Sequence, residues 1–156
     1  MMKKFIYVLL FYVMIFSSCD RGRLFEENKT IDGNAWYYKS FIPFDTEVKD
    51  TTKFYNVLVN VRVDADYKYA NMFMWVHVTN PEKKSDQRRV EIKLADERGK
   101  WLGSGLGDIF DYQFPVLQNI KFPKSGLYRF ELEQNMRDDT LLHVKSVGVR
   151  VEEVEK

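Results

Sequence analysis

Few residues of this 156-residue chain have side chains suited to catalysis or metal binding, and Cys19 is the only cysteine among them. A single thiol excludes a disulfide framework, and one cysteine with two histidines is a poor set for a soft metal. His77 lies in the apolar run around Val76 and Val78, which favours a packed or interface histidine over a ligand. His143 lies far along the chain, and neither histidine shows the HExxH or His-x-His spacing of a zinc site.

The sequence also lacks the signature of a serine hydrolase. A nucleophile elbow has the form GxSxG, and Gly103-Ser104-Gly105 does not match that spacing. A hydrolase in a sandwich scaffold would need a histidine in a cleft beside paired carboxylates, which the sequence alone does not indicate. We therefore expect a non-catalytic protein without catalytic residues, metal or cofactor.

The glycine-rich segment from Trp101 to Asp108 (WLGSGLGD) invites comparison with a phosphate-binding loop. Such a loop opens a helix whose N-terminal amides hold the anion, whereas here a strand-like pattern follows. We interpret the segment as a connection with positive φ at several glycines, anchored to the core by Trp101. A calcium site at Asp108 and Asp111 is a weaker alternative, because calcium takes about six to eight oxygen ligands.

The N-terminus has the features of an export signal. Lys3 and Lys4 precede an uncharged run, 5–16 (FIYVLLFYVMIF), which is shorter than the ~20 residues of a membrane-spanning helix. Its length fits the apolar part of a secretory signal, typically ~7–15 residues. Small residues 17 and 18 then precede Cys19, an arrangement that resembles the lipobox of bacterial lipoproteins, although Phe16 stands where leucine is usual. We predict a signal peptide over 1–18 and acylation of Cys19; the alternative is an ordinary signal with an incidental cysteine.

The charge balance indicates how the exported chain would be held. Loss of Lys3 and Lys4 leaves 22 basic against 23 acidic side chains, a net charge of −1. Binding to nucleic acid through phosphate neutralisation is therefore not expected, and the net charge gives no overall attraction to an anionic membrane. Attachment would rely on lipid. Residues 20–23 (DRGR) lack the acidic cluster of surface-export signals, which favours a periplasm-facing protein.

Beyond a polar tether expected over 19–34, apolar residues recur at every second position through 35–156, which indicates strands. The clearest face holds Tyr55, Val57, Val59, Val61 and Val63. The segment 72–79 is apolar on both faces, as in a central strand, and 36–44 is expected to be an edge strand ending at Pro43. A change of parity before Val147 predicts a bulge near Ser146. Seven or eight such strands predict an all-β fold: one antiparallel β-sandwich, jelly-roll or Ig-like.

Aromatic side chains make up 15% of the chain and allow a second function. Trp36, Tyr37 and Tyr38 could stack on sugar rings, which makes a glycan-binding envelope lipoprotein the alternative reading. Large aromatic residues more often lie in the core, however. An exposed aromatic patch would more readily serve a protein partner, and no other small-molecule ligand is expected.

The second half of the chain carries an ordered series of motifs. Residues 98–108 (RGKWLGSGLGD) are followed by 122–123 (FP), 126–130 (GLYRF), 133–137 (EQNMR) and 147–152 (VGVRVE). With the lipobox-like start, this series resembles the GldH family of gliding-motility lipoproteins of Bacteroidota over nearly the whole chain. The resemblance implies a cell-envelope lipoprotein of the motility apparatus and its associated type IX secretion system, with other envelope proteins as partners and no known catalysis.

Only Cys19 is carried over from that family as a functional residue. Gln134, Met136 and Arg137 match a family motif, and with Trp101 they are candidate partner contacts. A structural role at a strand end is equally compatible with the same motif, and Arg137 also begins a turn-like stretch.

The lipid prediction can be tested directly. Labelled palmitate is expected to enter the wild-type protein and not a Cys19→Ser variant, because the thiol is the acyl acceptor. Equal labelling of the two proteins would contradict the prediction.

Overall fold

The computed structural model describes residues 22–154. They form ten strands and one short 3-10 segment. The strands are β1 (Arg23–Thr30), β2 (Ala35–Tyr37), β3 (Ile42–Val48), β4 (Tyr55–Asp64), β5 (Asn71–Thr79), β6 (Ser85–Lys93), β7 (Ile109–Ile120), β8 (Gly126–Gln134), β9 (Thr140–Leu142) and β10 (Val144–Glu153), with η2 (Asp32–Asn34) after β1. None of these described residues forms a helix long and apolar enough to cross a membrane.

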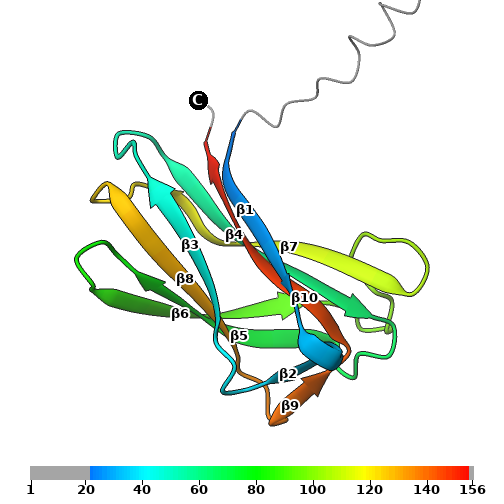
Figure 1. Ribbon diagram of the computed structural model, residues 1–156. Helices are drawn as coiled ribbons and strands as arrows, with labels where there is room; N and C mark the ends of the chain where they lie inside the picture. The colour runs from blue at the N-terminus through cyan, green and yellow to red at the C-terminus, as the bar shows by residue number, and fades with distance from the viewer. Residues whose placement is uncertain (1–21, 155–156) are drawn as a thin grey trace, which may run out of the picture.

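The strands form two four-stranded antiparallel sheets and a small ribbon (Figure 1). Sheet I has the order β1-β10-β4-β7, sheet II has the order β3-β8-β5-β6, and the ribbon pairs β2 with β9. The pairing is nested: β1 with β10, β2 with β9, β3 with β8, β4 with β7 and β5 with β6. The chain therefore forms one long hairpin that is rolled up so that β10 pairs with β4 and β5 pairs with β8. This topology is a jelly roll. The predicted sandwich is confirmed, in its jelly-roll rather than its Ig-like form.

The core fills the space between the two sheets. Val57, Val59, Val61 and Val63 of β4 are at most 2% exposed, and Met72 and Met74 of β5 face them from sheet II at 0%. The alternation read in the sequence is thus the inward face of β4. β5 has a neighbour on each side, as expected of a central strand.

Both prolines inside strands lie at sheet edges. Pro43 is in β3, the edge of sheet II, and Pro115 is in β7, the edge of sheet I. Proline has no N–H to donate, and in a central strand every N–H faces a neighbouring strand, whereas an edge strand leaves half of its N–H groups without a strand partner. The strand expected over 36–44 is wrong in its bounds, because residues 38–41 turn between β2 and β3 and β3 continues past Pro43 to Val48.

The bulge predicted near Ser146 is confirmed. The register of β10 against β4 shifts between Val144 and Ser146, which restores Val147, Val149 and Val151 to the buried face. Before the bulge the chain turns at His143, whose φ is 68°, in the left-handed region that few side chains adopt.

The tether expected over 19–34 does not extend that far. β1 takes up Arg23–Thr30 and pairs along its length with β10, so this polar stretch is an edge strand of sheet I. Five of its eight residues are exposed, while Phe25 packs against the core. An edge strand with one face in solvent can carry polar residues at most positions. The polar composition of 19–34 therefore predicted a linker where the structure has a strand.

Gly148 lies where β1 pairs with β10, and a larger residue does not fit there. A Cβ at this position would overlap the side-chain oxygen of Asn28 and the carbonyl oxygen of Glu27, both on β1. Gly148→Ala should therefore push β1 from the sheet and lower the free energy of unfolding by about 1–3 kcal/mol. Urea denaturation would measure the loss, with Ser146→Ala as the control. An unchanged midpoint would contradict the close approach.

Candidate functional site

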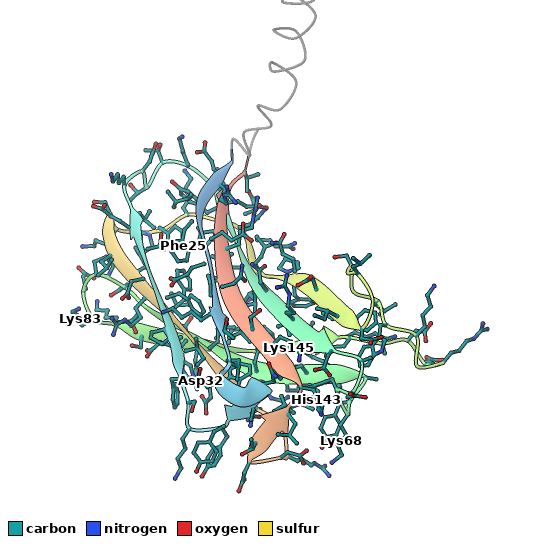
Figure 2. All side chains as sticks on the ribbon, turned by 45° about the vertical axis from the view of Figure 1, so that its right-hand side comes forward. Phe25, Asp32, Lys68, Lys83, His143 and Lys145 are labelled. Carbon is teal, nitrogen blue, oxygen red and sulfur yellow. The ribbon has the colours of Figure 1, made fainter. Side chains whose placement is uncertain are left out.

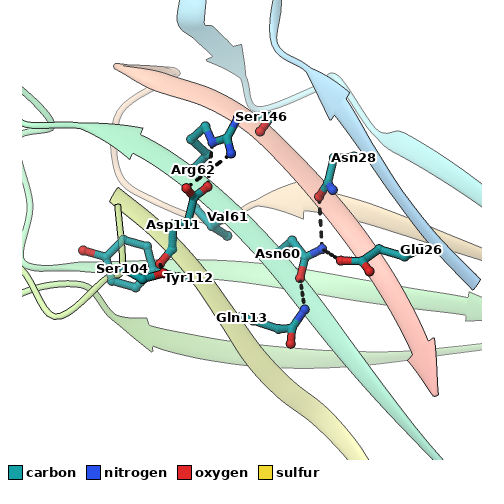
Figure 3. Close-up of a pocket in the computed structure, with 10 residues that line it drawn as sticks. All are labelled: Glu26, Asn28, Asn60, Val61, Arg62, Ser104, Asp111, Tyr112, Gln113 and Ser146. Atoms are coloured by element: carbon teal, nitrogen blue, oxygen red, sulfur yellow. Dashed lines mark hydrogen bonds and ion pairs between the residues drawn. The ribbon is translucent and has the colours of Figure 1, made fainter. Parts of the chain in front are cut away.

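The outer face of sheet I is hollowed into a polar groove (Figure 3). Its volume is about 390 Å³, and ten residues line it: Glu26, Asn28, Asn60, Val61, Arg62, Ser104, Asp111, Tyr112, Gln113 and Ser146. They come from β1, β4, β7, β10 and the loop before β7. The missing side chain of Gly148 leaves room beneath Asn28 at the centre of the sheet.

A chain of hydrogen bonds runs across the groove. Gln113 Nε2 donates to Asn60 Oδ1 at 2.9 Å, and Asn60 Nδ2 donates to Glu26 Oε1 at 2.9 Å and to Asn28 Oδ1 at 3.1 Å. Beside this chain of hydrogen bonds, the guanidinium group of Arg62 donates to the carboxylate of Asp111 at 2.6 and 3.2 Å. These outward positions alternate with the buried valines of β4, so the same pattern that builds the core also builds the groove.

Glu26 holds the negative charge at the β1 end of this network. Arg150 Nη1 donates to its Oε2 at 2.9 Å, and both side chains are largely buried, at 14% and 19% exposed. Burial raises the pKa of Glu26, but hydrogen bonds from Asn60, Arg23 and Arg150 together outweigh it and hold the pKa below its ordinary value of 4.5. The carboxylate is therefore ionised at neutral pH.

The groove offers donors and acceptors rather than a reactive centre. Among its ten lining residues, the hydroxyl of Ser104 donates to the carbonyl oxygen of Asp111 at 3.4 Å, and that of Tyr112 donates to the carbonyl oxygen of Leu94 at 2.7 Å. Neither hydroxyl is paired with a histidine or carboxylate in these contacts. Such a surface can bind a polar partner, but its geometry does not activate a nucleophile.

The glycine-rich segment contributes Ser104 to the lining of this groove. Ser104 and Asp111 exchange backbone hydrogen bonds of 3.0 and 2.6 Å, which closes a tight loop with Leu106 at its tip, 92% exposed. The positive φ predicted for several of these glycines occurs only at Gly107, at 65°, so that prediction is wrong for Gly103 and Gly105. Those two are required for space instead, because a Cβ on Gly105 would overlap the carbonyl oxygen of Ile109 and one on Gly103 would overlap the ring of Tyr112. The glycines are therefore needed for a compact loop, and a strand follows it instead of the helix that a phosphate site requires.

Three residues considered in the sequence analysis lie in or beside this loop. Trp101 is half-buried against the core and stacks on Phe110, with ring centroids 5.2 Å apart, so its predicted anchoring role is confirmed. Asp111 is held by Arg62, and Asp108 is exposed, so the two carboxylates considered for calcium do not form a joint cluster with a third ligand among the described residues.

The other candidate contacts lie after β8. Gln134 is 2% exposed; its Nε2 donates to the carbonyl oxygen of Asp138 at 3.0 Å and its Oε1 accepts from the N–H of Met136 at 2.8 Å. Its side chain organises the turn and has no surface to offer a partner, so the contact role predicted for it is wrong. Met136 is half-buried beside the N–H of Phe73, while Arg137 is exposed and stays a candidate.

Both histidines lie beside carboxylates. His77 Nε2 is 2.8 Å from Glu133 Oε2 on the outer face of sheet II, and Phe41 packs on its ring. His143 Nδ1 is 2.9 Å from Asp64 Oδ1 at the turn into β10. With Asp66, this second pair brings three potential metal-ligand atoms within 4.8 Å of one another.

A lysine ammonium group already lies beside the carboxylate of this cluster. Lys145 Nζ lies 2.8 Å from Asp64 Oδ2, and the N–H of Asp66 donates to Asp64 Oδ1 at 3.1 Å. Burial raises the pKa of Asp64, but these contacts and His143 outweigh it and lower the pKa. The ammonium group satisfies the charge that a metal would otherwise supply, so the cluster is a structural clamp at the turn into β10.

The aromatic platform expected for a glycan is not assembled. Trp36 is 1% exposed, and its Nε1 donates to the carbonyl oxygen of Ser40 at 2.9 Å. Tyr37 is 40% exposed and meets the edge of Tyr38. Because the ring of Trp36 is buried, it offers no face on which a sugar could stack, and the prediction of glycan binding depended on that face.

The fold and the groove define a β-sandwich module with a polar groove on the outer face of one sheet. A family model of the GldH lipoproteins matches residues 23–151, and the chain belongs to that family of gliding-motility lipoproteins. The family resemblance noted in the sequence is therefore confirmed.

Two relatives match along almost their entire length. The chain is 30% identical over 154 residues to a gliding motility lipoprotein GldH homolog of Christiangramia forsetii. It is 31% identical over 153 residues to the gliding motility lipoprotein GldH of Flavobacterium johnsoniae. Each alignment covers 94% of this chain and 94% of the relative.

Among solved structures, the VP2 subviral particle of infectious bursal disease virus aligns with 87% of this chain at a TM-score of 0.43 and 12% identity. This chain spans about a third of the VP2 chain (33%). A likeness this distant adds nothing to the functional argument.

The charged network makes a pH-dependent prediction. Because the pKa of Glu26 is lowered by folding, its stabilisation is complete above the ordinary carboxyl pKa and is lost as the pH falls through the folded-state pKa. Glu26→Gln should cost about 1 kcal/mol of unfolding free energy at neutral pH and less below about pH 4. Urea titrations at several pH values would show this, with Glu27→Gln as the surface control. A loss independent of pH would count against the assignment.

Proposed function

We propose that this protein is a lipid-anchored, non-catalytic component of the envelope apparatus for gliding motility and the associated type IX secretion system. Its signal peptide, 1–18, is removed, Cys19 is acylated, and the sandwich faces the periplasm. The observation that carries the proposal is kinship along 94% of both chains with lipoproteins named for gliding motility.

The groove of sheet I and the neighbouring loop tip are the proposed partner surface. Leu102 and Leu106 of this loop and Ile109 at the start of β7 expose 52%, 92% and 39% of their surface, beside the polar lining of the groove. An apolar contact surrounded by hydrogen-bonding groups is the usual composition of a protein interface. The loop is braced by Trp101 and by the Ser104–Asp111 bridge, so little order must be gained on binding.

Deletion of the gene should stop single-cell gliding and reduce secretion of type IX cargo. Complementation with the wild type should restore both, and complementation with Cys19→Ala should not, because the anchor is lost. Restoration by Cys19→Ala would retain the motility role and reject the anchor. Normal gliding and secretion after deletion would reject the proposal.

Leu106→Glu tests the partner surface separately. The side chain is almost fully exposed, so the fold should keep its stability while gliding of the complemented deletion falls at least several-fold. Leu142→Glu is the matched control, since Leu142 is 56% exposed on the β2–β9 ribbon. Microscopy would score gliding and immunoblotting would score protein level. Equal gliding by the two variants would remove the loop tip from the interface.

A further inference from the structure

Basic and acidic residues are unevenly distributed between the loops at the two ends of the sandwich. Three loops, 49–54, 80–84 and 121–125, lie at the end where β1 begins and β10 finishes (Figure 1). They carry six exposed lysines against two acidic residues: Lys49, Lys53, Lys83, Lys84, Lys121 and Lys124 against Asp50 and Glu82. The loops of the opposite end, 31–34, 38–41, 65–70, 94–108 and 135–139, carry seven acidic and five basic residues. Figure 2 shows Lys83 well apart from Asp32 and His143 of that end.

Some of these lysines are paired locally. Lys53 Nζ lies 2.7 Å from Glu153, and Lys124 Nζ lies 2.7 Å from Glu82. Lys84 is 3.7 Å from the same Glu82, so one carboxylate serves two ammonium groups. The amine of Lys121 lies over the ring of Phe54, 4.7 Å from its centroid. Lys49 lies 3.8 Å from Glu47. With Glu47 and Glu153 added to Asp50 and Glu82, six lysines still face four carboxylates, so a smaller surplus of positive charge remains at this end.

An apolar cleft opens at the same end, between the β5–β6 hairpin and the end of β7. Its volume is about 280 Å³. Its deep residues are Val76, Phe122 and Tyr128, all at most 3% exposed, and half-buried Val78 and Ile120 line its sides. β6 and β7 are edge strands of different sheets, so no strand closes the cleft on this side.

The rim of the cleft is mostly basic. Lys84, Arg88 and Lys121 line it, with Asp86 as the acidic member. Arg88 has the same parity along β6 as the buried Val90 and Ile92, so it points into the gap where the core would otherwise continue. Its Nη1 donates to the carbonyl oxygen of Val116 on the other sheet at 3.2 Å.

The sequence sets how far this end can lie from a lipid on Cys19. Four peptide steps separate Cys19 from Arg23, the first residue of β1, and a chain of that length spans at most about 14 Å. With the proposed acylation, this end of the sandwich faces the headgroups of the membrane, with the cleft at the β6 and β7 edges, across the sheets from β1.

We propose that this cleft binds an anionic phospholipid of the anchoring membrane. One acyl chain enters between the sheets, and Lys84, Arg88 and Lys121 hold the headgroup phosphate. The orientation rests on the proposed lipid anchor, but the lipid site itself does not require it. The net charge of −1 does not reveal this surface, because the strands and the loops of the opposite end together carry five more acidic than basic residues.

Lysophosphatidylglycerol below its micellar concentration is the probe, titrated calorimetrically into a chain of residues 19–156 that carries Cys19→Ser. This chain contains the whole described core, which extends from Ile31 to Val151. Lys84→Glu with Lys121→Glu should weaken binding at least about tenfold at low salt. Val78→Trp should abolish it by filling the cleft.

Lys39→Glu with Lys100→Glu is the matched control, because both lysines are exposed at the opposite end. Leu127→Trp is the control for bulk, since Leu127 is 55% exposed and does not line the cleft. Thermal melts would confirm that each variant is folded. Both controls should bind as the wild type does.

Three results would overturn the lipid site. Binding that survives both Lys84→Glu with Lys121→Glu and Val78→Trp would place the lipid elsewhere. Equal affinity for glycerophosphoglycerol, which lacks an acyl chain, would exclude the cleft, and equal affinity for lysophosphatidylcholine would exclude the basic rim. Palmitate labelling of Cys19 reports on the anchor independently, so the two proposals fail separately.

Discussion

β10 lies between β1 and β4, and its hydrogen bonds to both hold the fold together. It joins the last strand to the first and to the middle of the chain, so sheet I cannot form until residues far apart in sequence have met. Gly148 permits β1 to approach, and the bulge before Ser146 returns the valines of β10 to the core. Folding of such a sheet depends on non-local pairing, which carries a high closure entropy.

The same arrangement creates the surfaces that we assign to function. Because β1 joins the edge of sheet I, Glu26 and Asn28 reach the groove and complete the network that begins at Gln113. The loop with Leu106 rises from the other edge of that sheet, and the cleft lies where β6 and β7 diverge. Partner binding and lipid binding are thereby proposed for separate parts of one sandwich.

With the proposed acylation of Cys19, the N-terminal strand also limits the distance between the domain and the membrane. A tether extending to residue 34 would leave the sandwich free to turn, whereas β1 starting at Arg23 leaves only a few residues beyond Cys19. Lysines gathered near this end would then act at short range, where salt screens them least.

The sequence by itself determined the all-β class, the inward face of β4, the bulge in β10 and the family, because alternation and ordered motifs are local signals. It also contained the lipobox-like start, which lies outside the described residues. Only the tertiary structure decided that 23–30 is a strand, that Trp36 and Gln134 are buried, and which lysines share an end with the cleft. These facts depend on which distant segments pair, and neither periodicity nor net charge contains that information.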